Sequence, residues 1–142
     1  MPIRDRGLAR ITRAFERLEE AKILTGLQGD LDSNEVLKGF WTEYGTSKMP
    51  EWAWMRKTVF ENEDQIKRVA AGMIRRMILE TQAVDEQTLR RLGIFMEGLM
   101  KKQIRKTTTP PIKESTARKK GSDKPLIDTG RMINNIRSEV IL

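Results

Sequence analysis

The sequence predicts a helix-dominated α+β fold in one domain, and three features predict it. At 142 residues the chain has the length of one domain, enough to bury about two thirds of its unfolded surface. Two long segments carry apolar residues at helical spacing, with a short connection between them. Two shorter segments, residues 22–28 and 140–142, have compositions typical of strands. We therefore expect a single domain over residues 1–142, with a long antiparallel helical hairpin, a small β element and an extended basic arm at residues 107–125.

The first third of the chain predicts two helices around a strand. An amphipathic helix is expected from about residue 4 to 21, because apolar residues recur three or four apart: Leu8, Ile11, Phe15 and Leu18. Residues 22–28 lose this period, which favours a short strand that closes in a turn at residues 28–30. Asp32 or Ser33 can cap a second short helix, which Gly45 ends. That helix carries Val36, Leu37, Phe40 and Trp41.

The middle of the chain predicts the helical hairpin. Pro50 suits the first turn of a third helix in this part of the chain, because the N–H that proline lacks would be unpaired at a helix start anyway. The first hairpin helix extends to about Thr81, and Asp85 opens the second. Gly93 and Gly98 would allow a neighbouring helix to approach closely. We expect the hairpin to form the core of the subunit, through two apolar stripes: Ile66, Val69, Ala70, Met73, Ile74, Met77 and Ile78, then Leu89, Leu92, Met96, Leu99, Met100 and Ile104.

The last third of the chain loses helical periodicity. Three threonines followed by Pro110 and Pro111 favour extended backbone, and residues 121–125 form a second break. Asp128 can cap a last helix, because its side chain can accept a backbone N–H at a helix start. That helix carries Met132, Ile133 and Ile136 and precedes the strand at the C-terminus.

The composition excludes several classes of chemistry. The chain has no Cys and no His, which removes thiol nucleophiles, disulfides, histidine acid–base catalysis and nearly every zinc site. The sequence shows no apolar run of about 20 residues and no export signal. We expect no cofactor, no metal and no membrane insertion, and a protein made and used in cytoplasm.

One string resembles a catalytic motif. Residues 126–130 read LIDTG, and Asp-Thr-Gly after apolar residues is how an aspartic protease presents its carboxylate. That chemistry needs two carboxylates that share a proton, within a largely β chain. Only twelve residues follow Gly130, and they begin as a predicted helix. Helix capping by Asp128 is therefore the favoured interpretation, and we expect the protein not to be an enzyme.

The positive charge is confined to one segment. The net charge is +7, and residues 101–124 contain nine Lys or Arg against two acids. The rest of the chain is neutral. The segment is either a solvated loop or an arm that docks on an acidic neighbour, with binding to nucleic-acid phosphates as the alternative. Its arm residues are Lys113, Arg118, Lys119, Lys120 and Lys124.

Aromatic residues cluster between residues 41 and 60. Trp52 and Trp54 lie two apart, so on one helix they cannot share a face. We expect most of the cluster to be buried and one of these tryptophans to face a partner subunit, in preference to stacking on nucleic-acid bases. The cluster comprises Trp41, Tyr44, Trp52, Trp54 and Phe60.

Two blocks of sequence resemble a family of tailed-bacteriophage neck, minor tail and tail-completion proteins. Residues 41–46 (WTEYGT), then KMP at 48–50 and WAWMR at 52–56, resemble the family's "N-E-F/Y-G-T … I-P-x-R-x-F-x-R" block. Residues 110–116 (PPIKEST) and 119–136, with KKGSDKPLIDTGRM, resemble its "P-P-x-S-x-x-T … K-G-S-x-K-P-L-I-D-T-G-x-L/M … S-I" block. Trp52, Trp54 and Asn135 depart from the family's usual residues. With the helices between them, the blocks cover residues 35–142.

The resemblance implies a structural virion protein of the head–tail junction, without catalysis. Its members assemble as rings around the DNA path, so the expected partners are copies of the chain, six preferred and twelve as the alternative, and other neck, connector and tail proteins. The expected partners also include DNA passing through the neck, contacted without sequence specificity, and a stand-alone nucleic-acid-binding protein is the alternative function. The protein would be made in the cytoplasm of a bacterial host. The candidate interface residues are Trp41, Tyr44, Trp52, Trp54, Arg56, Pro110, Pro111, Asp128 and Arg131.

Overall fold

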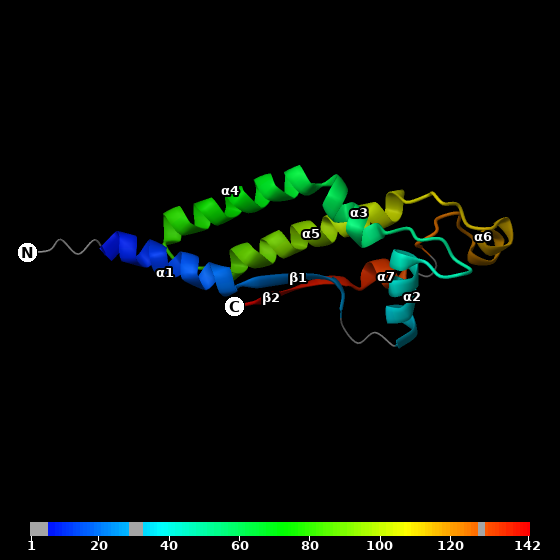
Figure 1. Ribbon diagram of the computed structural model, residues 1–142, viewed down its shortest axis with the longest axis horizontal. Helices are drawn as coiled ribbons and strands as arrows, with labels where there is room; N and C mark the ends of the chain where they lie inside the picture. Colours follow the sequence, from blue (N-terminus) through cyan, green and yellow to red (C-terminus); the bar gives the residue numbers. More distant parts are fainter. Residues whose placement is uncertain (1–5, 29–32, 128–129) are drawn as a thin grey trace, which may run out of the picture.

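The protein folds as a helix-dominated α+β structure, as the sequence predicts. The computed structural model describes residues 6–28, 33–127 and 130–142. Figure 1 shows an elongated molecule with α1 at one end and α6 at the other. The elements in chain order are α1 (Arg6–Glu20), β1 (Lys22–Leu27), α2 (Ser33–Tyr44), α3 (Trp54–Glu61), α4 (Glu63–Thr81), α5 (Glu86–Lys106), α6 (Glu114–Lys120), α7 (Arg131–Asn134) and β2 (Ile136–Ile141).

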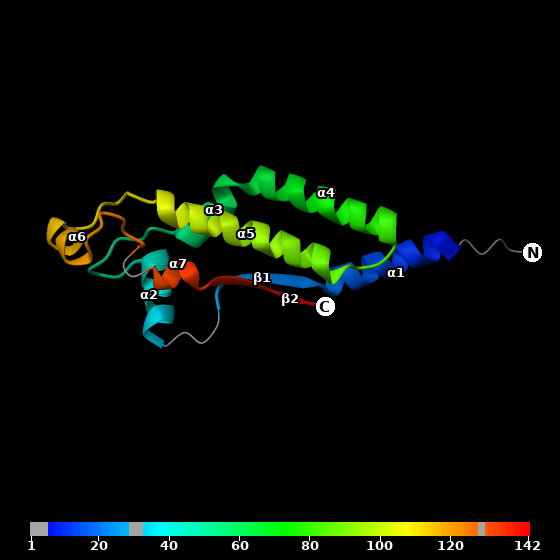
Figure 2. The same cartoon turned by 180° about the vertical axis from the view of Figure 1, so that it is seen from behind.

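Helix α5 is the axis of the molecule. The β1–β2 ribbon lies along one side of it and α4 along the other (Figures 1 and 2). The two strands pair antiparallel, from Lys22 opposite Ile141 to Leu27 opposite Ile136. The predicted strand at the N-terminal third therefore pairs with the C-terminal strand. The predicted turn at residues 28–30 falls partly outside the described residues.

The ribbon approaches α5 closely at Gly93. The Ser138 hydroxyl donates to the Gly93 carbonyl oxygen over 2.7 Å, and a Cβ on Gly93 would lie 2.7 Å from the Ser138 Cβ. Glycine is therefore needed here to admit a strand, where the sequence predicted a neighbouring helix. A Cβ on Gly98 would meet no atom within 4 Å, so the same expectation is wrong for Gly98.

The main core lies at one end of α5. It joins α5 to the start of α3 and the residues before it, to α7 and the loop before it, and to β2, through Trp52, Trp54, Met100, Ile104, Leu126, Met132, Ile133 and Ile136. Helix α4 belongs to a smaller cluster, in which Met77 and Ile78 pack on Ala14 of α1. The predicted hairpin is present, but the expectation that it forms the core is wrong for α4, since most of its stripe is only partly buried.

Local signals set the ends of the hairpin helices. Asp85 precedes α5 and its carboxylate accepts hydrogen bonds from the Gln87 N–H (3.1 Å) and the Thr88 hydroxyl (2.7 Å). The Thr88 hydrogen bond is the main cause of a lowered Asp85 pKa, because it stabilises the charged carboxylate. Helix α4 ends at Thr81, with Gln82 in the left-handed region at φ 50°. Both predicted boundaries are confirmed.

Two other boundaries differ from prediction, and a third falls outside the described residues. Pro50 lies in the loop before α3, which begins at Trp54 after Ala53 turns the chain at φ 49°. Ile136 was expected on the last helix but opens β2. That helix is short and starts directly after Gly130, whose φ is 78°. Asp128, the predicted cap, lies outside the described residues.

The predicted arm is only partly extended. Residues 107–113 are largely without regular structure and contain a cis Thr109–Pro110 bond, but residues 114–120 form α6, which ends at Gly121 with φ 70°. Ile112 and Ile127 pack against the main core. The segment is therefore anchored at both ends, while α6 itself has no buried residue. None of the described helices is long and apolar enough to cross a membrane.

We predict that Ile104→Ala lowers the free energy of unfolding by about 2–5 kcal/mol, because its side chain is fully buried and truncation leaves a cavity. Ile94→Ala is the matched control on the same helix, since Ile94 is 63% exposed, and should change stability by less than about 0.5 kcal/mol. Urea denaturation followed by circular dichroism measures both. Equal losses for the two variants would contradict the placement of the core.

Candidate protein interface

The joint between α2 and α3 is held by one buried carboxylate. Glu43, at 2% exposure, accepts hydrogen bonds from the N–H groups of Met55 (2.7 Å) and Arg56 (3.2 Å) in the first turn of α3. It also accepts from Arg56 Nε at 2.8 Å. A carboxylate satisfies the free N–H groups at a helix start and complements the positive end of the helix. The Glu43 hydrogen bond is the main cause of a raised Arg56 pKa.

The neighbouring residues complete this joint, which comprises Thr42, Glu43, Gly45, Thr46 and Arg56. The Arg56 guanidinium donates to the Glu43 carbonyl oxygen at 2.7 Å. Gly45 has φ 74°, and a Cβ there would lie 2.9 Å from the Glu51 nitrogen. The Thr46 hydroxyl accepts from the N–H groups of Lys48 and Met49. The joint thus assigns a structural task to the central residues of the block at 41–46.

Trp52 and Trp54 belong to the core of their own subunit, so their prediction as interface residues is wrong. They are 3% and 0% exposed. The Trp54 indole donates to the Thr42 hydroxyl at 3.2 Å, and the Trp52 indole donates to the Pro110 carbonyl at 2.7 Å. The argument from helical spacing fails because Trp52 precedes the helix. The left-handed turn at Ala53 lets both side chains enter one cluster.

Helix α2 has its polar residues inside and its apolar residues outside. The buried side consists of Glu35, Thr42 and Glu43, with Gly39. The outward face, named the α2 face below, comprises Val36 (50% exposed), Leu37 (42%), Phe40 (58%), Trp41 (40%) and Tyr44 (55%). Exposed large apolar clusters on a soluble domain mark interaction surfaces. Trp41 and Tyr44 were predicted as interface residues, and this placement leaves them accessible to a partner.

Except for Arg56, the remaining interface candidates in the described part of the chain lie apart from the α2 face. Pro110 and Pro111 are exposed in the loop before α6. Arg131 is largely exposed and lies 3.7 Å from a carboxylate oxygen of Glu35, so it joins α7 to α2. Arg56 is half-exposed, and its guanidinium stacks 4.9 Å above the Tyr44 ring. Of these residues, the structure brings only Arg56 to the edge of the α2 face.

The basic residues of the predicted arm have unequal roles. Arg118 forms an ion pair with Glu114 on α6. The Lys120 ammonium donates to the carbonyl oxygens of Lys124 (2.9 Å) and Pro125 (3.2 Å), which closes the loop behind α6. Lys113 and Lys119 are exposed. Lys113 and Lys119 are therefore the arm residues best placed to contact a partner without disturbing the loop.

Sequence patterns did not reveal that the apolar row of α1 is largely exposed. Leu8 is 61% and Phe15 is 50% exposed, while Ala14 is the buried residue. Ile11 and Leu18 pack only partly against α4. A helical stripe predicts that one side is covered, and it does not say whether the cover comes from the same chain or another.

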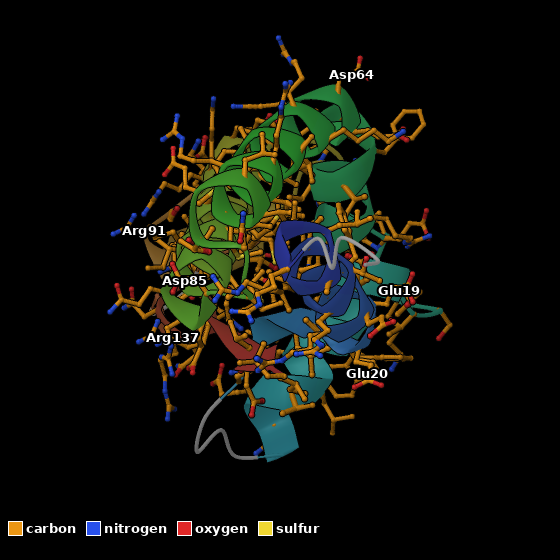
Figure 3. All side chains as sticks on the ribbon, turned by 90° about the vertical axis from the view of Figure 1, so that its left-hand side faces the viewer. Glu19, Glu20, Asp64, Asp85, Arg91 and Arg137 are labelled. Carbon is orange, nitrogen blue, oxygen red and sulfur yellow. The ribbon has the colours of Figure 1, made fainter. Side chains whose placement is uncertain are left out.

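The groove between α4 and α5 is lined by charged side chains that pair with one another or cap a helix. It has a volume of about 480 Å³ and is lined by charges of both signs, among them Arg68, Arg76 and Arg91. Its acids already have partners: Glu80 lies 3.9 Å from Arg76, and Asp85 caps α5. Figure 3 shows Asp85 and Arg91 on the same edge of the molecule. Among the described residues, no three acids, cysteines or histidines gather as a metal site would require.

No family model, curated protein or solved structure matches this chain. Its function is therefore inferred from its own residues.

We predict that Glu43→Gln lowers the free energy of unfolding by about 1–3 kcal/mol, because a neutral amide is a weaker acceptor for the α3 N–H groups. Glu51→Gln is the control, because Glu51 also contacts Arg56, at 3.3 Å, but is exposed. Exposed ion pairs contribute little, so its denaturation curve should stay close to wild type. A Glu43→Gln curve that also overlies wild type would show that the joint does not depend on this carboxylate.

Proposed function

We propose that this chain is a structural protein of the head–tail junction of a tailed bacteriophage, where copies assemble as a ring around the DNA path. The observation that carries the proposal is the α2 face, an apolar helix surface directed away from the core of its own subunit. A surface of this kind needs a protein partner to cover it. The resemblance of residues 41–56 and 110–136 to neck and tail-completion proteins supplies the kind of assembly.

The structure makes physical sense of the residues that carry the resemblance. In the first block, Glu43, Gly45 and Thr46 build the α2–α3 joint. In the second block, Gly121 ends α6 and the Lys120 ammonium closes the following loop. These contacts orient α2 and the basic segment on the subunit. They support a shared structural role for the two blocks and name no catalytic task for either.

A ring requires two complementary surfaces on each subunit, since non-identical surfaces join copies head to tail and close when the rotation permits. The chain exposes apolar helix surfaces on both α1 and α2. We propose six copies, with twelve as the alternative, contacting other neck, connector and tail proteins.

The proposal predicts density for this chain at the head–tail junction of intact virions of its phage. Cryo-electron microscopy of the neck is the measurement, with antibody labelling of the purified particle as an independent check. A ring of chain density fitted by the α4–α5 hairpin and the ribbon is the expected result. A complete neck reconstruction into which the chain does not fit would overturn the proposal.

The basic segment generates a second prediction. Lys113→Glu combined with Lys119→Glu should leave the thermal melt of the free subunit unchanged, because both side chains are exposed, and should reduce the joining of heads to tails by removing charge at a contact. Arg75→Glu, an exposed reversal on α4, is the control and should preserve joining. Plaque formation in a complementation assay measures the difference.

The same variants separate the proposal from stand-alone nucleic-acid binding. Binding through phosphates weakens steeply as salt concentration rises. Tight, salt-sensitive binding of the purified subunit to duplex DNA, lost in the double variant while joining persists, would favour the alternative function. Normal joining without DNA affinity would show that these lysines serve neither contact.

A further inference from the structure

The outer edge of β1 is open. The two strands pair antiparallel with Thr25 opposite Ser138, and the Gln28 N–H donates to the Asn135 carbonyl oxygen at 3.1 Å. Bonded and non-bonded pairs alternate along such a ladder, so Ile23 and Thr25 direct their N–H and C=O groups away from β2. Within the described residues, these backbone groups have no hydrogen-bond partner. Strand β1 therefore presents a stretch of unpaired backbone.

The outer edge of β2 is protected by charged side chains. The Glu97 carboxylate of α5 accepts a hydrogen bond from the outward N–H of Ser138 at 2.7 Å. The Arg137 guanidinium donates to the Ile136 carbonyl oxygen at 3.0 Å. Charged side chains at a strand edge oppose the pairing of another strand there. The ribbon is therefore open to a further strand at β1 and blocked at β2.

An apolar groove with a volume of about 300 Å³ lies beside the open edge. We name it the β1 groove. Ile23 and Thr25 form one wall, and the floor consists of Leu92, Met96 and Met100 of α5. Helix α4, which lies across α5 from the ribbon (Figures 1 and 2), forms the opposite wall. All the described residues that line the groove are uncharged.

The open edge and the apolar floor together specify an extended polypeptide as the occupant. Backbone N–H and C=O groups two residues apart are matched by the backbone of another strand. The side chains of that strand point alternately towards α5 and away from it, so the floor requires apolar residues at every second position. From Leu92 to Met100 the floor is about 12 Å long, which corresponds to about four residues of strand.

A single strand from a different protein fits the groove better than a second copy of this chain. Ile66 and Ala70 of α4 lie opposite β1, so the edge of a ribbon that carries its own helices would collide with α4. The longer described connecting segments do not supply a suitable strand either. Residues 45–53 contain a lysine, a proline and a glutamate, residues 107–113 contain two prolines, and residues 121–127 contain adjacent charges. Proline lacks the N–H that pairing requires.

We propose that the β1 groove binds one extended segment of a different protein, which adds a third strand to the ribbon through the backbone of Ile23 and Thr25. The segment is uncharged over about four residues, and its apolar side chains lie on Met96 and Met100. This contact would cover the open edge and the apolar floor together. The inference rests on the groove and the strand edge, and it does not depend on the head–tail function.

Peptide display on the purified full chain tests the proposal. A library of random peptides of about eight residues, long enough to cover the edge, is selected on the wild-type protein. We expect enriched sequences with apolar residues at alternate positions. A synthetic peptide of one such sequence should bind Val59→Glu at least about tenfold more weakly than wild type. Val59 lines the groove and is 50% exposed, so the bound strand would bury the new charge.

Phe60→Glu is the matched control. Phe60 is the next residue of α3, is 81% exposed and does not line the groove. This variant should therefore bind the peptide as wild type does. Both variants should keep the thermal melt of wild type, because the replaced side chains are exposed.

Ester substitution in the synthetic peptide tests the backbone pairing directly. Replacing one amide at a time by an ester removes a single N–H without adding bulk. Affinity should fall at every second position, because alternate N–H groups of the bound strand face β1. This series changes only the peptide, so its result does not depend on the stability of a protein variant.

Three results would overturn the proposal. A library that yields no sequence enriched on wild type over Val59→Glu would show that the groove binds no peptide strand. An ester series without alternation would show that the backbone of β1 takes no part in binding. Self-association of the chain that is lost in Val59→Glu would show that a second copy occupies the groove.

Discussion

The position of α2 depends on the Glu43 carboxylate. Glu43 accepts hydrogen bonds from the free N–H groups at the start of α3 and forms an ion pair with Arg56. One side chain therefore joins two helices that are otherwise connected only by a loop. The buried position of Glu43 makes these hydrogen bonds necessary, because a carboxylate removed from water must be compensated. Once Glu43 and Thr42 are held inside, the geometry of the helix directs Phe40, Trp41 and Tyr44 outward.

The same joint links the core to the surface that we propose as an interface. The Thr42 hydroxyl accepts a hydrogen bond from the Trp54 indole N–H, and Trp54 belongs to the same main core as Ile104 of α5. A change in the packing of α5 would therefore be transmitted to α2 through a short series of contacts.

The predicted helical hairpin survives in the structure with a different role. Helix α5 is central because its two sides serve different neighbours: the ribbon packs where Gly93 admits Ser138, and α4 lies on the other side. Helix α4 lies at the periphery and packs with α1 through Met77 and Ile78. Its remaining apolar residues are only partly covered by the described residues of the same subunit.

The sequence by itself determined the local structure. Apolar periodicity located α1, α4 and α5. Helix-capping residues located several boundaries, with Asp85 before α5 and Gly45 after α2, because capping depends on neighbours within a few residues. The composition excluded catalysis and metal binding by cysteine or histidine, because the chain contains neither residue. The resemblance in residues 41–56 and 110–136 suggested the kind of assembly. The sequence could not show which of the tryptophans are buried.

Only the tertiary structure decided which apolar surfaces are covered. Trp52 and Trp54 enter the core because the backbone turns at Ala53, which lies between them. The α2 face points outward because Glu43, on the opposite side of the helix, accepts hydrogen bonds from the start of α3. The ribbon pairs residues more than a hundred positions apart in sequence, as the contact between Thr25 and Ser138 illustrates. Periodicity records that a helix has an apolar side. Which neighbour covers that side depends on contacts between distant segments, whose free energies no local pattern contains.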